Sequence, residues 1–222
     1  MAVDHLFRVA CGMDSMVMGE TQILGQIKTA FNQAKTCNAI DTSFEELSQV
    51  TYAVAKKVRF STEVGMCPVS IASIASKKVC ALLENELSQS NVLIIGSGET
   101  TELLLSYLQK LPFKSITIAA RNQERAQQIA KVCQAKVITL CDLHDALVEA
   151  DVVMSATASQ VPILGKGAVE TALLKRNQRP MILIDMAVPR DIEVEFTYKG
   201  IYVRTENGET FISSNHYSKY YF

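Results

Sequence analysis

The strongest structural signal in the chain is the stretch Val92-Leu93-Ile94-Ile95-Gly96-Ser97-Gly98-Glu99-Thr100-Thr101-Glu102-Leu103-Leu104-Leu105. Its first four residues are apolar and predict a strand that is buried on both faces. Gly96-Ser97-Gly98 then predicts a tight turn, and the leucines that follow recur at helical spacing. A strand, a glycine turn and a helix in this order are typical of a dinucleotide-binding site. Gly96 permits the turn, Gly98 lets a pyrophosphate approach the backbone, and the helix N-terminus offers unpaired N–H groups to its phosphates.

Thr101 occupies the position at which the dinucleotide pattern usually has its third glycine. That glycine normally permits close packing of the helix against the strand, so Thr101 is expected to loosen this packing without abolishing the site. An ordinary tight strand-to-helix turn can show the same glycine spacing. The turn alone therefore leaves two interpretations open, and the residues after it decide between them.

The 222-residue chain has the composition of a globular protein, with 48% hydrophobic and 20% charged residues. No apolar run reaches the roughly 18 residues of a membrane span, and the first residues do not resemble a signal peptide. The expected location is the cytoplasm, with no membrane partner. The net charge of −1 excludes a general electrostatic attraction to nucleic acid. The six cysteines lack the spacing of metal ligands, so no metal site is expected and most of them are expected to be buried.

The pattern of the chain changes near residue 91. Before it, the sequence predicts only helices: one beginning near Glu20, one opened by a capping box at Ser43–Glu46 and ending near Val64, and one with Pro68 in its first turn. After it, the predicted strands are residues 92–95, 115–121, 136–140, 151–157, 180–187 and 200–204, with helices at 122–133, 142–150 and 167–176 between them. This alternation predicts an α/β fold with a doubly wound parallel, Rossmann-like sheet, preceded by a helical part.

Polar side chains gather where the helix near Glu20 begins. Glu20 is expected in the first turn, where the helix dipole favours a carboxylate, and Gln22 and Gln26 share one face. A solvated polar face is one interpretation, and the basic residues Lys56, Lys57 and Arg59 of the next helix are interpreted in the same way. Glycines at positions 12, 19 and 25 crowd this stretch, however, and indicate close approach of the backbone to another group.

Arg121 ends the second predicted strand, about 25 residues past Gly96, where a dinucleotide fold faces the adenine ribose. A site for NAD would place Asp or Glu there to accept a hydrogen bond from the 2′-hydroxyl. A guanidinium instead pairs with a 2′-phosphate. Arg121, with Arg125 one turn further on, therefore predicts a preference for NADP(H), and a surface arginine at a strand end is the alternative.

Two more strand ends carry polar residues. Ser155-Ala156-Thr157-Ala158 ends the fourth strand, on the edge where the nicotinamide half of a cofactor usually lies. Ala187-Val188-Pro189-Arg190-Asp191 follows the fifth strand. Arg190 and Asp191 are interpreted as a local ion pair at a helix start.

Three segments together closely resemble the glutamyl-tRNA reductase family: the run from His5 to Gln26, Gly96-Ser97-Gly98-Glu99-Thr100, and Ala187-Val188-Pro189-Arg190-Asp191. The resemblance covers about residues 2–203. It implies a catalytic domain, an NADPH domain and a dimerisation domain along one long helix. It also implies an enzyme in which a cysteine thiolate attacks the glutamyl ester of tRNA(Glu) and NADPH reduces the thioester to glutamate 1-semialdehyde. This reaction is the first step of the five-carbon route to tetrapyrroles (porphyrins and haem).

Matched residue by residue, the resemblance assigns glutamate binding to Ser15, Glu20, Thr21, Gln22 and Gln26. A carboxylate suits the substrate ammonium, while amides and hydroxyls suit its other groups. His5 matches a histidine that assists turnover as proton donor or positioning group. The residues that match the cofactor turn are Gly96, Ser97, Gly98, Glu99, Thr100 and Thr101. The implied partners are glutamyl-tRNA(Glu), a second subunit in a homodimer and a glutamate-semialdehyde aminomutase that receives the product.

The chain departs from the family pattern in two places. The family nucleophile lies in a Ser-Thr-Cys-Asn-Arg context upstream of the histidine run, and none of the six cysteines has that context. Cys11 is interpreted as a packing residue. Residues 205–222 match nothing in the family, whose dimerisation helices are expected there. We therefore interpret the chain as a fragment whose segments are the helical part of the catalytic domain (1–66), a linking helix (67–90), the NADP-binding domain (91–204) and an unassigned tail (205–222).

Such a fragment is expected to bind NADPH without reducing glutamyl-tRNA, because the thioester needs a thiolate held beside the cofactor. Two alternatives stay open. A shikimate-dehydrogenase-like NADP oxidoreductase also places basic residues after its second strand, although the run from Ser15 to Gln26 argues against it. A non-catalytic NADPH-binding module is compatible with the missing nucleophile.

Overall fold

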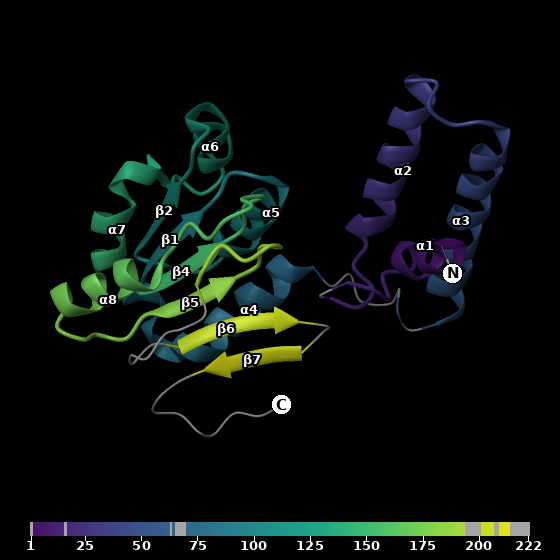
Figure 1. Cartoon of the computed structure of the whole chain (residues 1–222). Coiled ribbons are helices and arrows are strands. Elements are labelled where there is room, and N and C mark those ends of the chain that lie inside the picture. Colours follow the sequence, from purple (N-terminus) through teal and green to yellow (C-terminus); the bar gives the residue numbers. More distant parts are fainter. Residues whose placement is uncertain are drawn as a thin grey trace. The chain divides into compact units, whose positions relative to one another are not determined.

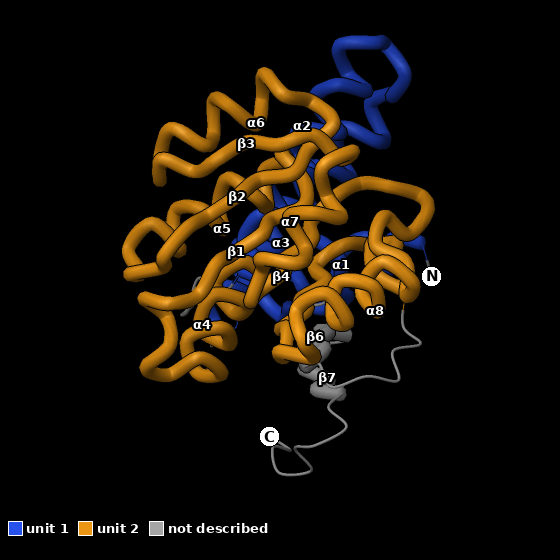
Figure 2. Tube along the Cα trace, turned by 90° about the vertical axis from the view of Figure 1, so that its left-hand side faces the viewer, with its two compact units in different colours: residues 1–71, 206–209 blue, residues 72–205, 210–222 orange. Residues whose placement is uncertain are grey.

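The computed structural model describes residues 2–15, 17–62, 64, 70–193, 201–206 and 209–213. The chain divides into two compact units, Met1–Ile71 with Glu206–Glu209, and Ala72–Thr205 with Thr210–Phe222 (Figure 2). The main division therefore falls at Ile71, where a helix begins. The finer division into four segments stays a prediction. None of the described helices is long and apolar enough to cross a membrane.

The described residues of the first unit form the α-helices α1 (Ala2–Ala10), α2 (Gln22–Thr36) and α3 (Thr42–Ser61) (Figure 1). They share a small apolar cluster whose buried members are Ala10, Cys11, Leu24 and Ala55. Ile27, Tyr52, Val54 and Val58 pack around it, at the helical spacing that buries one face of each helix. The buried position of Cys11 agrees with its interpretation as a packing residue.

Both ends of α3 differ from the prediction. Asp41, and not Ser43, caps α3, because its carboxylate accepts a hydrogen bond from the Phe44 N–H at 3.0 Å. Asp is as good an N-cap as Ser, and it comes first along the chain. The same helix ends at Ser61, before the expected Val64. The helix α4 (Ile71–Leu83) follows, and Pro68, expected in its first turn, lies outside the described residues.

The second unit is a seven-stranded sheet in the order β3-β2-β1-β4-β5-β6-β7. The strands are β1 (Asn91–Ile95), β2 (Ser115–Ala119), β3 (Lys136–Ile138), β4 (Val152–Ser155), β5 (Ile182–Asp185), β6 (Ile201–Glu206) and β7 (Glu209–Ser213). The first six pair in parallel, which confirms the doubly wound α/β fold. β7 was not predicted; it runs opposite to β6 in Figure 1 and falls in the segment left unassigned.

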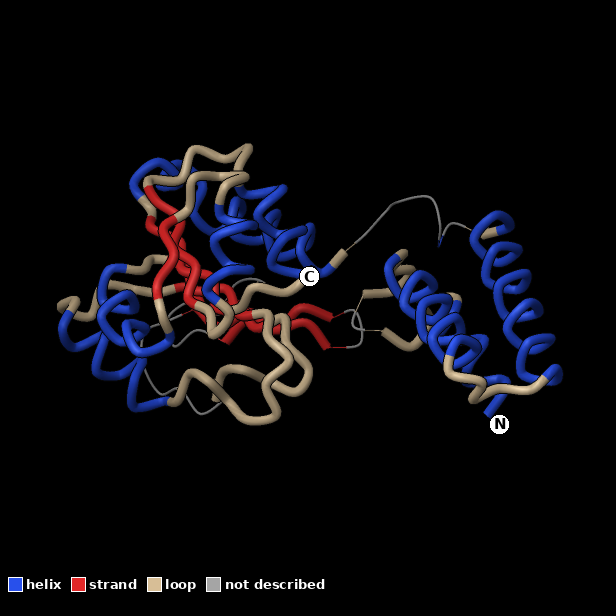
Figure 3. The backbone as a smooth tube through the Cα atoms, turned by 90° about the horizontal axis from the view of Figure 1, so that it is seen from above, coloured by secondary structure: helices blue, strands red, loops and turns tan. Residues whose placement is uncertain are grey.

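Helices lie on either side of these strands (Figure 3). They are α4, the 3-10 helix η2 (Glu84–Gln89), α5 (Glu99–Leu108), α6 (Gln123–Ala130), the 3-10 helix η3 (Leu140–Asp142), α7 (Leu143–Glu149) and α8 (Lys166–Lys175). Each predicted strand and helix of this unit is present with ends that differ by a few residues. β2, for example, stops at Ala119, so Arg121 lies two residues beyond it.

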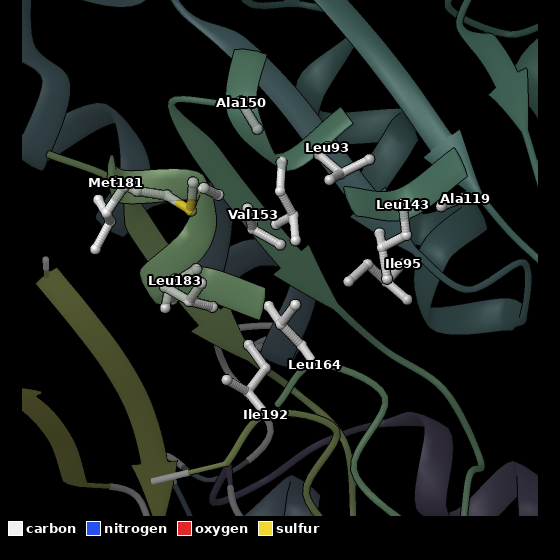
Figure 4. Close-up of a cluster of buried hydrophobic side chains, with 14 residues drawn as sticks. Leu93, Ile95, Ala119, Leu143, Ala150, Val153, Leu164, Met181, Leu183 and Ile192 are labelled. Carbon is white, nitrogen blue, oxygen red and sulfur yellow. The ribbon is translucent and has the colours of Figure 1, made fainter. Parts of the chain in front are cut away.

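The core of the second unit forms where α7 and α8 contribute buried side chains to one face of the sheet (Figure 4). Leu93 and Ile95 of β1 join this cluster because alternate residues of a strand point to the same face. Ile94 points to the opposite face and is also fully buried. Both faces of β1 are therefore covered, which explains the unbroken apolar run in the sequence.

Candidate functional site

The glycine turn after β1 has a conformation that requires glycine at one position and leaves space at another. Gly96 has φ +120°, and a Cβ there would lie 2.5 Å from the Ala156 carbonyl oxygen. Gly98 immediately precedes α5, and nothing lies within 4 Å of a Cβ built on it. The turn therefore packs tightly against the end of β4 at Gly96 and opens to solvent at Gly98. An unobstructed helix N-terminus of this kind suits a phosphate group.

A cavity of about 300 Å³ lies beside this turn, at the carboxyl ends of β1, β2 and β4. Strand order reverses at β1, which lies between β2 and β4, and such a reversal is where open α/β sheets bind ligands. The cavity lining includes Gly96, Ser97, Gly98, Arg121, Asn122, Arg125, Ala156, Thr157 and Ala158. The structure therefore brings the glycine turn, Arg121 and the end of β4 together, although they are far apart in the sequence.

The remaining residues matched to the cofactor turn lie in the first turn of α5. Glu99 and Thr100 do not line the cavity. Thr101 is completely buried, and its hydroxyl has no hydrogen-bond partner among the described residues. Thr101 therefore lies in the packed interior and not in the cavity lining, and the looser packing expected from it stays a prediction.

Two guanidinium groups stand on one rim of the cavity. Arg121 is exposed, whereas Arg125 is half-buried and forms an ion pair with Glu102 of α5. Asn122 caps α6 by accepting a hydrogen bond from the Arg125 N–H at 2.9 Å, which fixes the start of this helix at the cavity. The rim can therefore receive a second anionic group in addition to a pyrophosphate at the turn.

Asp191 holds the opposite side of the cavity, and its predicted ion pair with Arg190 is wrong. Its carboxylate is fully buried and accepts hydrogen bonds from the Ser155 hydroxyl at 2.6 Å, the Thr157 N–H at 2.9 Å and the Thr157 hydroxyl at 2.6 Å. No helix starts here within the described part of the chain, because Ile192 forms a β-bridge with Leu164. Asp191 therefore joins the ends of β4 and β5 instead of forming a local ion pair with Arg190 at a helix start.

Asp185, the last residue of β5, is a second buried carboxylate that sequence reasoning missed. It accepts hydrogen bonds from the backbone N–H groups of Ala187, Asp191 and Ile192 at 3.0, 3.1 and 3.0 Å. Burial raises the pKa of this carboxyl to about 6, because the charged form loses its hydration. The available signal was its position at the end of an unbroken apolar strand, where a charged residue is unusual.

The residues matched to glutamate binding lie in the first unit, between α1 and the first turns of α2. Glu20 precedes the helix instead of lying in its first turn, since Thr21 is the N-cap and Gln22 is the first helical residue. Burial raises the pKa of the Glu20 carboxyl. Ser15 donates hydrogen bonds to the carbonyl groups of Gly12, at 3.4 Å, and Val17. These residues therefore share one turn-rich segment.

Two glycines fix the path of this segment. Gly12 and Gly19 have φ +75° and +82°, and the Gly19 N–H donates to the Gly12 carbonyl at 2.8 Å. A Cβ on Gly19 would lie 2.5 Å from the Val64 carbonyl oxygen. At Gly12 and Gly19 the backbone therefore closely approaches other parts of the same chain. A Cβ on Gly25, in contrast, would meet nothing within 4 Å.

The side chains of Arg59 and His5 lie on the helices next to this segment. Arg59 of α3, expected on a solvated face, is half-buried and donates from Nη2 to the Glu20 carbonyl at 3.2 Å. His5 is 70% exposed on α1, with its Nδ1 3.3 Å from the Asp14 carboxylate, which also contacts Arg8. Arg59 is thus a supporting residue that the sequence alone did not identify, because its partner lies 39 residues away.

The cysteines do not follow the expectation that most are buried. Among the described cysteines, Cys11 is buried, Cys80 and Cys133 are half-buried, and Cys37 and Cys141 are exposed; Cys67 lies outside the described residues. Burial raises the pKa of the Cys11, Cys80 and Cys133 thiols, which disfavours the reactive thiolate.

The sheet and the cavity at its switch point define a Rossmann-like protein with a cavity of the dinucleotide-binding type. Residues 74–205 match the family described as Shikimate / quinate 5-dehydrogenase, and residues 1–62 match Glutamyl-tRNAGlu reductase, N-terminal domain. The curated glutamyl-tRNA reductases of Pseudoalteromonas translucida and Pseudoalteromonas atlantica are 50% and 48% identical to this chain over 86% and 87% of its length. The chain belongs to the glutamyl-tRNA reductase family, as the resemblance of its motifs predicted.

The similarity extends to a solved structure. Glutamyl-tRNA reductase from Methanopyrus kandleri is 34% identical to this chain and superposes with a TM-score of 0.51, over 86% of this chain and 48% of that one. The chain spans about half the length of the curated relatives that it matches, 46% of each of the two compared above.

Proposed function

We propose that the whole protein reduces glutamyl-tRNA(Glu) to glutamate 1-semialdehyde with NADPH, through a cysteine thioester, as the first step of five-carbon tetrapyrrole biosynthesis. The proposal rests on one observation: the same chain contains a segment similar to the N-terminal domain of this reductase and a cavity of the dinucleotide-binding type. A segment matching the N-terminal domain of that reductase precedes a dinucleotide-type cavity with two arginines on its rim.

The cavity fits NADPH in its chemistry. The open backbone at Gly98 and the N-terminus of α5 would hold the pyrophosphate, and Arg121 would hold the 2′-phosphate. The bound cofactor supplies a hydride. The residues Ala156, Thr157 and Ala158 form the part of the lining that would face its nicotinamide half and exclude water from it.

The segment around Glu20 would hold the glutamyl group. The Glu20 carboxylate would pair with the substrate ammonium. Burial raises the pKa of this carboxyl, and the positive charge of the ammonium would lower it. Ser15, Thr21, Gln22 and Gln26 supply hydroxyl and amide groups for the other polar atoms of the substrate. His5, exposed on α1, would assist as a proton donor or positioning group.

We further propose the partners that this function requires: tRNA(Glu) carrying the glutamyl group, a second subunit in a homodimer, and a glutamate-semialdehyde aminomutase that takes up the reactive product. The proposed location is the cytoplasm. The 222 residues by themselves should bind NADPH without forming product, because none of their cysteines has the sequence context of the family nucleophile.

The test is product formation by the whole protein with glutamyl-tRNA and NADPH, compared with its Glu20→Gln variant. A charge-assisted contact is worth about 1.5–3 kcal/mol, so turnover should fall about 10- to 100-fold while NADPH affinity stays unchanged. Glu46→Gln, on the exposed side of α3, is the matched control and should turn over normally. Absence of semialdehyde from the wild type would overturn the function, and turnover within twofold in Glu20→Gln would overturn the role of Glu20.

A shikimate-type NADP oxidoreductase is the second candidate, because residues 74–205 match that family. It predicts reduction of NADP⁺ by shikimate or quinate in the same preparation. The match of residues 1–62 to the tRNA reductase domain favours the first proposal. NADPH binding with neither reaction in the whole protein would favour a non-catalytic binding module.

A further inference from the structure

The far side of the cavity depends on a hydrogen-bond network that connects the lining residue Thr157 to Asp191, which does not line the cavity. Thr157 is the centre of this network: its hydroxyl donates to Asp191 and accepts from the Ser159 N–H at 3.1 Å, while its own N–H also donates to Asp191. A hydroxyl that both donates and accepts has one orientation. The side chain of Thr157 is therefore fixed by partners that come later in the chain.

Thr157 also forms part of the cavity wall and lies next to the glycine turn. A Cβ on Gly96 would lie 3.2 Å from the Thr157 Cγ2 atom and 2.5 Å from the Ala156 carbonyl oxygen. Thr157 and Ala156 thus leave no room for a side chain at Gly96, and all three residues line the cavity. A shift of Thr157 would change both the width of the cavity and the position of the turn.

Asp191 is itself held by fixed partners. Its backbone N–H donates to the Asp185 carboxylate at 3.1 Å, and its carbonyl accepts from the Ile163 and Leu164 N–H groups at 2.7 and 2.9 Å. Ile163 also lines the cavity. The Asp191 carboxylate therefore presents its two oxygens to Ser155 and Thr157 from a position that the backbone determines.

We propose that Asp191 is a positioning residue for the cofactor site: it fixes the Thr157 hydroxyl, and through it the wall of the cavity next to the glycine turn. The assignment rests on the proposed binding of NADPH. Three donors converge on this carboxylate, two hydroxyls and one N–H. An amide in its place has one acceptor oxygen and adds two donors of its own, so Thr157 would lose its fixed orientation.

The experiment measures NADPH affinity by fluorescence for the wild-type chain, Asp191→Asn, Thr157→Val and the double variant. Valine keeps the shape of threonine and removes only the hydroxyl. Loss of a buried hydrogen bond should weaken NADPH binding about 5- to 30-fold in each single variant. In the double variant Thr157→Val should add less than about twofold to the effect of Asp191→Asn, because the two residues act through one interaction.

Two further variants separate positioning from general loss of structure. Thr157→Ser keeps the hydroxyl and should bind NADPH with an affinity within about threefold of the wild type. If only the methyl group of Thr157 mattered, Thr157→Ser would bind NADPH more weakly than Thr157→Val. Thr171→Val removes a hydroxyl that donates within α8 to the Gly167 carbonyl at 2.7 Å, outside the cavity lining, and should leave affinity unchanged.

The outcomes are distinct. If the wild type binds NADPH and both Asp191→Asn and Thr157→Val bind it with an affinity within twofold of the wild type, only the positioning role is overturned. Additive losses in the double variant would also overturn it. A wild-type chain that does not bind NADPH would overturn the proposed function together with this inference. If Asp191→Asn does not fold, the comparison of Thr157→Val with Thr157→Ser carries the test.

Discussion

The two sides of the cavity are built in different ways. The side formed by the glycine turn and Arg121 consists of short motifs within about 30 residues, and its cations reach solvent. The side formed by Thr157 depends on Asp185 and Asp191, buried carboxylates whose partners lie up to 36 residues away. The first side offers charge to a ligand, whereas the second fixes a shape. Substitutions on the first side should therefore change mainly cofactor affinity, whereas substitutions on the second side should also change stability.

The largest effect is expected where the two sides meet, at Gly96. Gly96→Ala places a Cβ 2.5 Å from the Ala156 carbonyl at a φ of +120°, so the turn or the end of β4 must shift. NADPH affinity should fall on the order of 100-fold, and the free energy of unfolding by about 1–3 kcal/mol. Calorimetry of binding and urea unfolding measure both.

Gly98→Ala is the control for that substitution, because its Cβ would meet no atom within 4 Å and its φ is −82°. Its stability should stay within about 1 kcal/mol of the wild type, the range of substitutions at a helix N-cap. NADPH affinity should still fall, since the added methyl group occupies the approach of the pyrophosphate. Equal destabilisation by both alanines would contradict the geometry of the turn.

The next effect concerns stability on the buried side, through Asp185. Its pKa is about 6 in the folded chain against 3.8 ordinarily, so the folded state binds this proton more tightly. Protonation of Asp185 therefore adds stability that is complete below the ordinary pKa and is lost as the pH rises through about 6. The contribution is about 3 kcal/mol at most.

Urea unfolding at pH 5, 6 and 7.5 tests this pH dependence. The free energy of unfolding of the wild type should rise relative to that of Asp185→Asn as the pH falls from 7.5 to 5. Asp145→Asn, at an exposed position of α7, is the control and should follow the wild type at every pH. A constant difference between the wild type and Asp185→Asn would show that the carboxyl stays ionised throughout.

On the exposed side, Arg121 should decide between the two nicotinamide cofactors. Arg121→Asp is expected to lower NADPH affinity about 10- to 100-fold, with little change for NADH, because the charge-assisted contact to the 2′-phosphate is lost. Titration of both cofactors against both proteins measures the preference. Lys131→Asp reverses a charge just beyond α6, away from this cavity, and should preserve the wild-type preference. Equal affinities in the wild type would contradict the assignment.

The smallest effect is expected at Glu102, whose carboxylate pairs with Arg125. Glu102→Gln removes the competing anion, so NADPH affinity should rise by about two- to threefold, the scale of an exposed ion pair. Glu124→Gln, exposed at the start of α6, is the matched change of charge and should have no effect. A loss of affinity in Glu102→Gln would show that the pair holds Arg125 in its binding position.

The same contrast explains what the sequence could predict. The glycine turn, the six parallel strands and the position of Arg121 depend on short patterns, and each is present in the structure. Asp191 was misinterpreted because its partners, Ser155 and Thr157, precede it by 36 and 34 residues, and no local pattern reports such a pairing. Arg59, which contacts the Glu20 carbonyl, was missed for the same reason.

Other differences arise from competition between equivalent local signals. Asp41 and Ser43 are both good N-cap residues, and the chain uses the first of them. β7 has no apolar run comparable with that of β1, and its pairing depends on the neighbouring strand. Its position could therefore not be read from propensity alone.

The pairing of β1 with β4 has a consequence for how this unit folds. Ile95 pairs with Ser155, so the cavity floor requires the chain to close a loop of about 60 residues before its two walls exist. Contacts of such long range form slowly, and no early local intermediate of the glycine turn alone would contain the complete pocket. A ligand of this cavity therefore stabilises only the fully folded unit, and the rise in melting temperature that it causes depends on its free concentration relative to its dissociation constant.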